Sequence, residues 1–154
     1  VSERDMRSIQ KDLEEMEAYA MRKGPMPEGH AVLDTGCLRG CGGPISLDGY
    51  TEDCGVTTRM KGSAMRFRGV NDSAPVTAEG EQEVSAGLAG ADVNLRFQRL
   101  PKSKTPILMS VHQLEELDTI LYIKECKADF KAIQKYGVPL NKTEKGHLTI
   151  SLKD

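Results

Sequence analysis

The sequence has no tryptophan, few other aromatic residues and no long apolar run. Its 154 residues include three phenylalanines and four tyrosines. The core is therefore expected to be aliphatic and to depend in part on a dimer or partner interface. A membrane-spanning helix needs about 20 consecutive, mainly apolar residues, and no such run exists. The sequence predicts no membrane span.

Neither sign of charge dominates. The 21 Lys and Arg residues and the 23 Asp and Glu residues are mixed along the chain and give a formal net charge of −2. This pattern lacks the basic patch with which proteins attract nucleic acid or an anionic membrane. With 38% hydrophobic and 29% charged residues, the composition is that of a soluble, single globular domain. No signal or transit peptide is recognisable, and the start at Val1 is compatible with processing of a precursor and an intracellular or organellar location.

Motifs for several classes of catalysis and nucleotide binding are also missing. The sequence has neither a Gly-x-Ser-x-Gly nucleophile elbow nor a phosphate-binding loop, although glycines are frequent between Thr35 and Gly62. That range is expected to be loop, either a surface connection or the rim of a substrate cleft. The three histidines, His30, His112 and His147, share no metal-ligand spacing and are interpreted as surface or helix-end residues.

The four cysteines allow more than one interpretation. Cys37, Cys41 and Cys54 could bind zinc with His30 as the fourth ligand, but their spacing matches no common zinc motif. Disulfides would require an oxidising compartment. We therefore expect reduced thiols, with Cys37 as a packing residue, and neither a metal nor an organic cofactor.

The most informative stretch is Asp34-Thr35-Gly36, which follows the apolar run Ala31–Leu33. A buried strand that leads into Asp-Thr-Gly is how aspartic proteases present a catalytic carboxylate. The same residues are also ordinary turn formers, so a strand followed by an Asx-type turn is the alternative. The choice between the two depends on the rest of the chain.

Aspartic protease chemistry needs two carboxylates that face one water molecule. Two carboxylates about 3 Å apart cannot both ionise, so they share a proton, and the pair titrates as a unit. The ionised member acts as the general base on water, and the protonated member donates to the scissile carbonyl. Asp-Thr-Gly occurs once in this sequence. The reaction would therefore require two chains.

Several other segments occur in an order that resembles a retropepsin-like aspartic protease domain, of the kind in copia-type retrotransposon polyproteins. Gly29–Cys37 is similar to the strand and active-site turn of that family, and Met65–Asp72 to the start of its substrate-covering hairpin. Thr105–Ser110 resembles the strand that leads into the C-terminal helix. The final segments, Val138–Leu140 and Gly146–Leu152, resemble the close of these domains.

The resemblance implies a mainly β fold: an acid-protease barrel with one helix in its C-terminal half. It also implies a homodimeric endopeptidase in which each chain gives Asp34 to a shared site. Thr35 and Gly36 would brace the turn. Substrate-binding residues would come from the hairpin that closes over an extended peptide, namely Phe67, Gly69, Val70 and Asn71.

The chain also differs from the family pattern. Arg68 replaces an aromatic or apolar residue, Met109 and Ser110 stand where viral enzymes carry glycine, and Asp118 stands where a glycine usually follows the helix. The segment from Thr77 to Asn94 is unusually polar. These differences motivate a second hypothesis: a domesticated, catalytically silent subunit with a structural or binding role in a larger protein assembly.

An N-terminal addition divides the chain into residues 1–24 and a retropepsin-like domain over residues 25–154. Ser2 to Lys23 is predicted to form an amphipathic helix that Gly24-Pro25 ends. Its apolar residues recur every three or four positions and could pack on the same domain or bind a partner helix. The partner-binding candidates are Met6, Ile9, Leu13 and Met16.

Apolar alternation and turn residues predict the remaining elements. Ser110 and Gln113 form a Ser-x-x-Gln capping box, which predicts a helix with Val111, Leu114 and Leu117 on its apolar face. The predicted strands are Ala31–Leu33, Ala64–Arg68, Val76–Ala78, Glu83–Leu88, Val93–Leu100, Ile107–Met109, Thr119–Ile123, Asp129–Ile133 and Leu148–Leu152.

Overall fold

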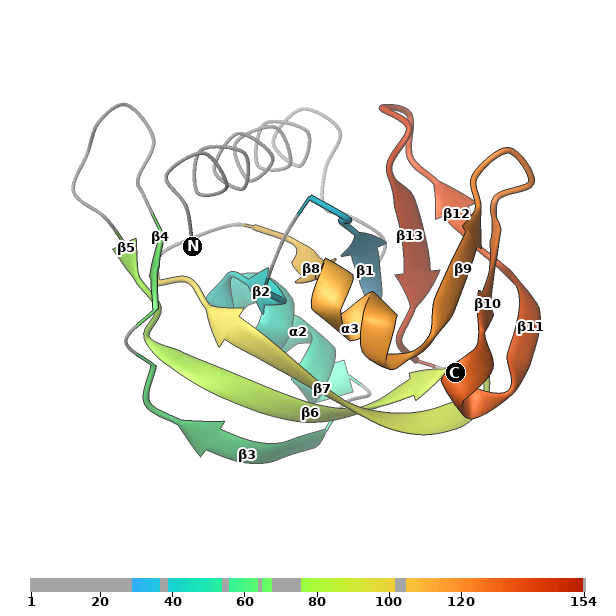
Figure 1. The fold of residues 1–154 in the computed structure, drawn as a ribbon. Helices are drawn as coiled ribbons and strands as arrows, with labels where there is room; N and C mark the ends of the chain where they lie inside the picture. Colours follow the sequence, from blue (N-terminus) through green and yellow to red (C-terminus); the bar gives the residue numbers. More distant parts are fainter. Residues whose placement is uncertain are drawn as a thin grey trace.

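The computed structural model describes residues 29–36, 39–53, 56–63, 65–67, 76–101 and 105–153 (Figure 1). Over these ranges the fold is mainly β, as expected, with a helix in the C-terminal half. The strands are β1 (His30–Leu33), β2 (Cys41–Gly42), β3 (Val56–Lys61), β4 (Arg66–Phe67), β5 (Val76–Thr77), β6 (Gly80–Leu88), β7 (Ala91–Arg99), β8 (Ile107–Met109), β9 (Thr119–Tyr122), β10 (Lys127–Phe130), β11 (Lys135–Pro139), β12 (Asn141–Lys142) and β13 (Leu148–Ser151). The helices are α2 (Pro44–Asp53) and α3 (Val111–Glu116), with a 3-10 turn η2 (Lys131–Ile133). The helix expected from Ser2 to Lys23 lies outside these ranges.

β1 lies inside an eight-stranded sheet with the order β12-β13-β1-β8-β2-β7-β6-β3. It pairs antiparallel with β13 and parallel with β8. Ala31, Val32 and Leu33 are all buried, so both faces of the strand are covered. A continuous apolar run is what a strand covered on both faces requires.

β6 and β7 form a long hairpin that curves around the core (Figure 1). In β6, buried residues alternate with partly exposed ones along the whole strand, so one face points inward. The two-residue turn has positive φ angles at both Ala89 (51°) and Gly90 (84°). Such a turn matches the right-handed twist of the flanking strands. Both strands begin earlier than the sequence predicts. Two ion pairs involve the outer face of the hairpin: Lys61–Glu81 at 3.2 Å and Arg96–Glu83 at 3.1 Å.

The expectation of a loop from Thr35 to Gly62 is wrong, because this range contains both α2 and β3. Proline is favoured at the first position of a helix, and Pro44 occupies it in α2. Leu47 and Tyr50, one turn apart, bury the inner face of α2 in the main core. The Tyr50 hydroxyl donates to the Leu152 carbonyl at 2.8 Å and ties the helix to the C-terminal segment.

Arg99 connects α2 to the β6–β7 hairpin. Its guanidinium lies 2.7 Å from the Asp48 carboxylate and 3.0 Å from the Glu79 carboxylate. The hydrogen bond to Asp48 contributes most to raising the pKa of Arg99, against the opposing effect of burial. Arg99 therefore stays charged and holds two acidic residues from different elements.

A three-stranded sheet, β11-β10-β9, packs beside the main sheet (Figure 1). The predicted strand Asp129–Ile133 is correct only as far as Phe130. Lys131–Ile133 form the 3-10 turn instead, and Gln134 then takes a left-handed conformation with φ of 56°. This reversal lets the chain return as β11, a strand that the sequence did not predict.

One main apolar cluster joins the two sheets, α2 and α3. Leucine, isoleucine, valine and alanine dominate it, as expected, but every phenylalanine of the chain is also buried: Phe67, Phe97 and Phe130. A second cluster under the other face of β1 contains Val32, Leu108 and Phe67. The three phenylalanines thus fill positions at which the elements meet.

We predict that Tyr50→Phe lowers the free energy of unfolding by about 1 kcal/mol, because it removes one buried hydrogen bond without changing the packing. The Leu152 carbonyl keeps its bond from the Gly87 N–H, so it is not left without a donor. Denaturant unfolding measures the change. Tyr136→Phe is the control, since Tyr136 is 63% exposed. Equal effects of the two substitutions would contradict the prediction.

A second stability prediction concerns the β6–β7 turn. Ala89→Asn is expected to raise the free energy of unfolding by about 0.5–1 kcal/mol, because asparagine tolerates a positive φ better than alanine does. Thermal unfolding would show a higher midpoint. Ala132→Asn is the control at an exposed alanine that does not have a positive φ. A lower midpoint for Ala89→Asn would refute the expectation.

Candidate active site

Asp34 lies directly after β1, and its backbone is fixed by the neighbouring strand. The parallel register pairs Val32 with Leu108 and Leu33 with Met109. The Asp34 N–H then donates to the Met109 carbonyl at 3.0 Å, which continues this pairing one residue past the strand. The position of the carboxylate is therefore set by two buried strands.

The Asp34-Thr35-Gly36 turn orients the carboxylate. The Gly36 N–H donates to Asp34 Oδ1 at 3.0 Å, as in an Asx turn. Asp34 Oδ2 is buried, whereas Thr35 and Gly36 are exposed. The turn therefore fixes the direction of the carboxylate, and its other two residues face the solvent.

The corner between β8 and α3 supports the turn from behind. Ser110 Oγ accepts from the Gln113 N–H at 3.2 Å, and Gln113 Oε1 accepts from the Ser110 N–H at 2.8 Å. This confirms the predicted capping box at the start of α3. Because Ser110 follows Met109, the box also fixes the strand end that holds Asp34.

After the turn, the chain returns to the same sheet as β2. Cys41 is buried and pairs with Leu108 of β8 on one side and with Gln98 of β7 on the other. One residue earlier, the Gly40 carbonyl accepts from the Gln98 N–H at 2.8 Å. Both ends of the loop from Asp34 to Gly40 are thus attached to the main sheet. We name this segment the catalytic loop, after the role that we propose for Asp34 below.

Of the candidate substrate-binding residues, only Phe67 lies in the described ranges. It belongs to β4, which pairs with β5 as the two arms of a hairpin would. Phe67 is buried and packs in one cluster with Val32 of β1 and Leu108 of β8. This packing places the base of the expected hairpin next to the strands that carry the catalytic loop. The remaining candidates fall outside the described residues: Gly69, Val70, Asn71, Met6, Ile9, Leu13 and Met16.

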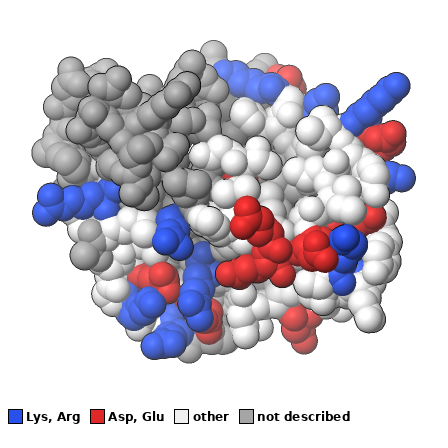
Figure 2. Space-filling view, viewed as in Figure 1, with Lys and Arg blue, Asp and Glu red and all other residues white. Residues whose placement is uncertain are grey.

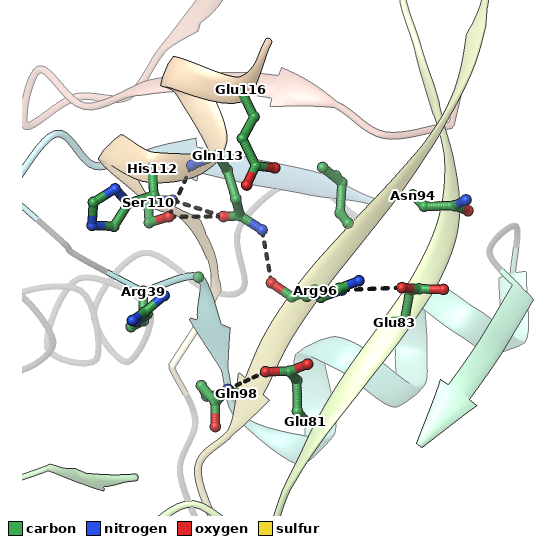
Figure 3. Close-up of a pocket in the computed structure, with 12 residues that line it drawn as sticks. Arg39, Glu81, Glu83, Asn94, Arg96, Gln98, Ser110, His112, Gln113 and Glu116 are labelled. Carbon is green, nitrogen blue, oxygen red and sulfur yellow. Dashed lines mark hydrogen bonds and ion pairs between the residues drawn. The ribbon is translucent and has the colours of Figure 1, made fainter. Parts of the chain in front are cut away.

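A polar pocket of about 380 Å³ lies between α3 and the β6–β7 hairpin (Figure 3). Residues of both charge signs line it, and Figure 2 shows acidic side chains near the middle of this face with basic ones beside them. Gln113 Nε2 donates across the pocket to the Arg96 carbonyl at 2.7 Å. Sequence reasoning found the capping role of Gln113 but missed this bond, because Arg96 lies on a distant part of the chain.

The described residues do not form a recognisable metal-binding cluster. No three His, Cys, Asp or Glu side chains among them gather closely enough to bind one. His30 instead lies 3.4 Å from Thr149 Oγ1 and from Asn141 Nδ2. Cys41 and Cys126 are thiols, as expected; Cys37 and Cys54 fall in the gaps between described ranges. In those ranges, no helix has the length and apolarity needed to cross a bilayer.

No protein-family model and no curated protein sequence matches this chain. Among solved structures, it is similar to the retroviral protease-like domain of Ddi1 from Leishmania major. The similarity covers 70% of this chain and 79% of that domain, with 15% sequence identity and a TM-score of 0.46.

Proposed function

We propose that this chain is a retropepsin-like aspartic endopeptidase domain, of the kind found in copia-type retrotransposon polyproteins. In this proposal, two copies each contribute Asp34 to one site. The observation that carries the proposal is the anchoring of Asp34 at the end of the buried strand β1. Its backbone is bound to Met109, and its carboxylate is oriented by the Gly36 N–H.

The chemistry follows from two such carboxylates that share one proton. The ionised carboxylate takes a proton from water as the water oxygen bonds to the scissile carbonyl carbon. The other carboxyl group gives its proton to the carbonyl oxygen. The resulting diol then collapses: the C–N bond breaks, the amine nitrogen receives a proton from the first carboxyl group, and the second carboxylate takes one back from the diol. Water is the only other reactant.

The exposed turn supports the requirement for two copies. A single chain has one Asp-Thr-Gly sequence, and a lone carboxylate cannot be both base and acid. Thr35 and Gly36 are exposed, so a second copy can approach the turn along a twofold axis. An extended peptide would lie between the two turns, with the β4–β5 hairpin of each copy closing over it.

We predict that the purified domain cleaves peptides under mildly acidic conditions and that Asp34→Asn reduces kcat to below about a thousandth of the wild-type value. The asparagine amide has similar size but cannot exchange a proton with water. A peptide library analysed by mass spectrometry would detect cleavage. Asp92→Asn, which changes an exposed aspartate on β7, should leave the activity unaltered. Full activity of Asp34→Asn would exclude the mechanism.

A mixing experiment tests the shared site. Excess Asp34→Asn subunits should suppress the activity of wild-type subunits, because a mixed dimer has only one ionisable carboxylate. Sedimentation should show a dimer of the wild-type chain. A stable monomer would instead favour the silent subunit, docked on a larger assembly through Met6, Ile9, Leu13 and Met16.

A further inference from the structure

We infer that Gln113 is a positioning residue that fixes the catalytic loop through both ends of its side-chain amide. This inference rests on the proposed peptidase function and deepens it. Gln113 lies on α3, and its side-chain amide bonds to Ser110 and Arg96. It would act through the two strands to which the loop is attached.

The amide makes hydrogen bonds on two sides. Its oxygen accepts from the Ser110 N–H at 2.8 Å, directly after the residue whose carbonyl holds Asp34. Its nitrogen donates to the Arg96 carbonyl on β7 at 2.7 Å (Figure 3). One rigid amide therefore joins the β8–α3 corner to β7. The two ends of the catalytic loop are bonded to the same two elements, Asp34 to β8 and Gly40 to β7.

Gly40 shows that the loop passes directly against this amide. A Cβ atom added at Gly40 would lie 2.7 Å from Gln113 Nε2 and 2.8 Å from the Arg96 carbonyl oxygen. Real Cβ atoms essentially never come so close, and neither neighbour can retreat without breaking the hydrogen bond between them. This close approach therefore requires glycine at position 40, and the Gln113 amide fixes the position of this end of the loop.

The neutral amide is needed for more than the cap. A glutamate at position 113 could still accept from the Ser110 N–H, as in an ordinary capping box. It could not donate to the Arg96 carbonyl while ionised. The charged and titratable groups around this position are Arg39 of the catalytic loop, Glu81 and Glu83 of β6, Arg96 of β7, and His112 and Glu116 of α3.

The expected consequence is a change in turnover rather than in peptide binding. Asp34 stays bonded to Met109, but the other end of the loop loses one of its supports, so the two carboxylates meet less accurately. Misplacement of a reacting group by about 1 Å can cost about 10²-fold in rate. Removal of the amide should therefore lower kcat while KM changes little.

The test compares the kcat of wild type, Gln113→Glu, Gln113→Leu and Glu116→Gln from about pH 4 to about pH 7, around the usual glutamate pKa of about 4.3. Glu116→Gln alters the same pocket but not the amide, and should match wild type.

Relative to wild type, Gln113→Glu should be most active at low pH, where a protonated carboxyl group can donate to the Arg96 carbonyl. Its activity relative to wild type should fall as pH rises. Gln113→Leu should be impaired about equally at every pH. A pH-independent ratio for Gln113→Glu, or wild-type kcat for Gln113→Leu, would overturn the inference.

Amide hydrogen exchange separates this inference from the proposed function, since it needs no activity. The Gln98 N–H, which donates to the Gly40 carbonyl, should exchange faster in Gln113→Leu and in Gly40→Ala than in wild type. The increase should be larger than the one expected from the change in the global free energy of unfolding. Gly49→Ala is the control glycine, since nothing lies within 4 Å of its added Cβ. Unchanged exchange at Gln98 would refute the positioning role, whereas a wild-type chain that cleaves no peptide would refute the peptidase function alone.

Discussion

The parallel pairing of β1 with β8 is the constraint on which the rest of the structure depends. Neighbouring strands in antiparallel sheets need only a short turn, but parallel neighbours need a long excursion of the chain between them. Here that excursion contains α2, the β4–β5 arms and the β6–β7 hairpin. Because parallel strands end at the same edge of a sheet, the end of β1 with Asp34 and the start of α3 lie side by side.

Features with local signals could be predicted from the sequence, and features set by distant contacts could not. The apolar runs of β1 and β8 and the Ser110–Gln113 box were correct because each is encoded in a few adjacent residues. α2 was missed because its inner face consists of little more than Leu47 and Tyr50, and Gly49 lies between them. Asp118, directly after α3, has a φ of 51°, and aspartate is among the residues that tolerate this conformation.

The same distinction between local signals and distant contacts applies to the candidate site. Asp34, Thr35 and Gly36 form one continuous motif, so the sequence located the turn. The bond from Gln113 to Arg96 joins α3 to β7, and the close approach at Gly40 depends on both. Neither could be read from spacing, because the residues that meet there come from three separate segments. The contacts that support Asp34 are thus harder to recognise in the sequence than Asp34 itself.

The partners of β1 also determine when this region can form during folding. Ala31 pairs with Ile107, 76 positions later, and with Ile150, 119 positions later. Contacts between such distant residues form slowly, because closing long loops costs conformational entropy. During synthesis, β1 can pair with β8 only after Met109 has been made, and with β13 only after Ser151 has been made. The turn that carries Asp34 therefore gains its geometry only after residues far along the chain have been synthesised.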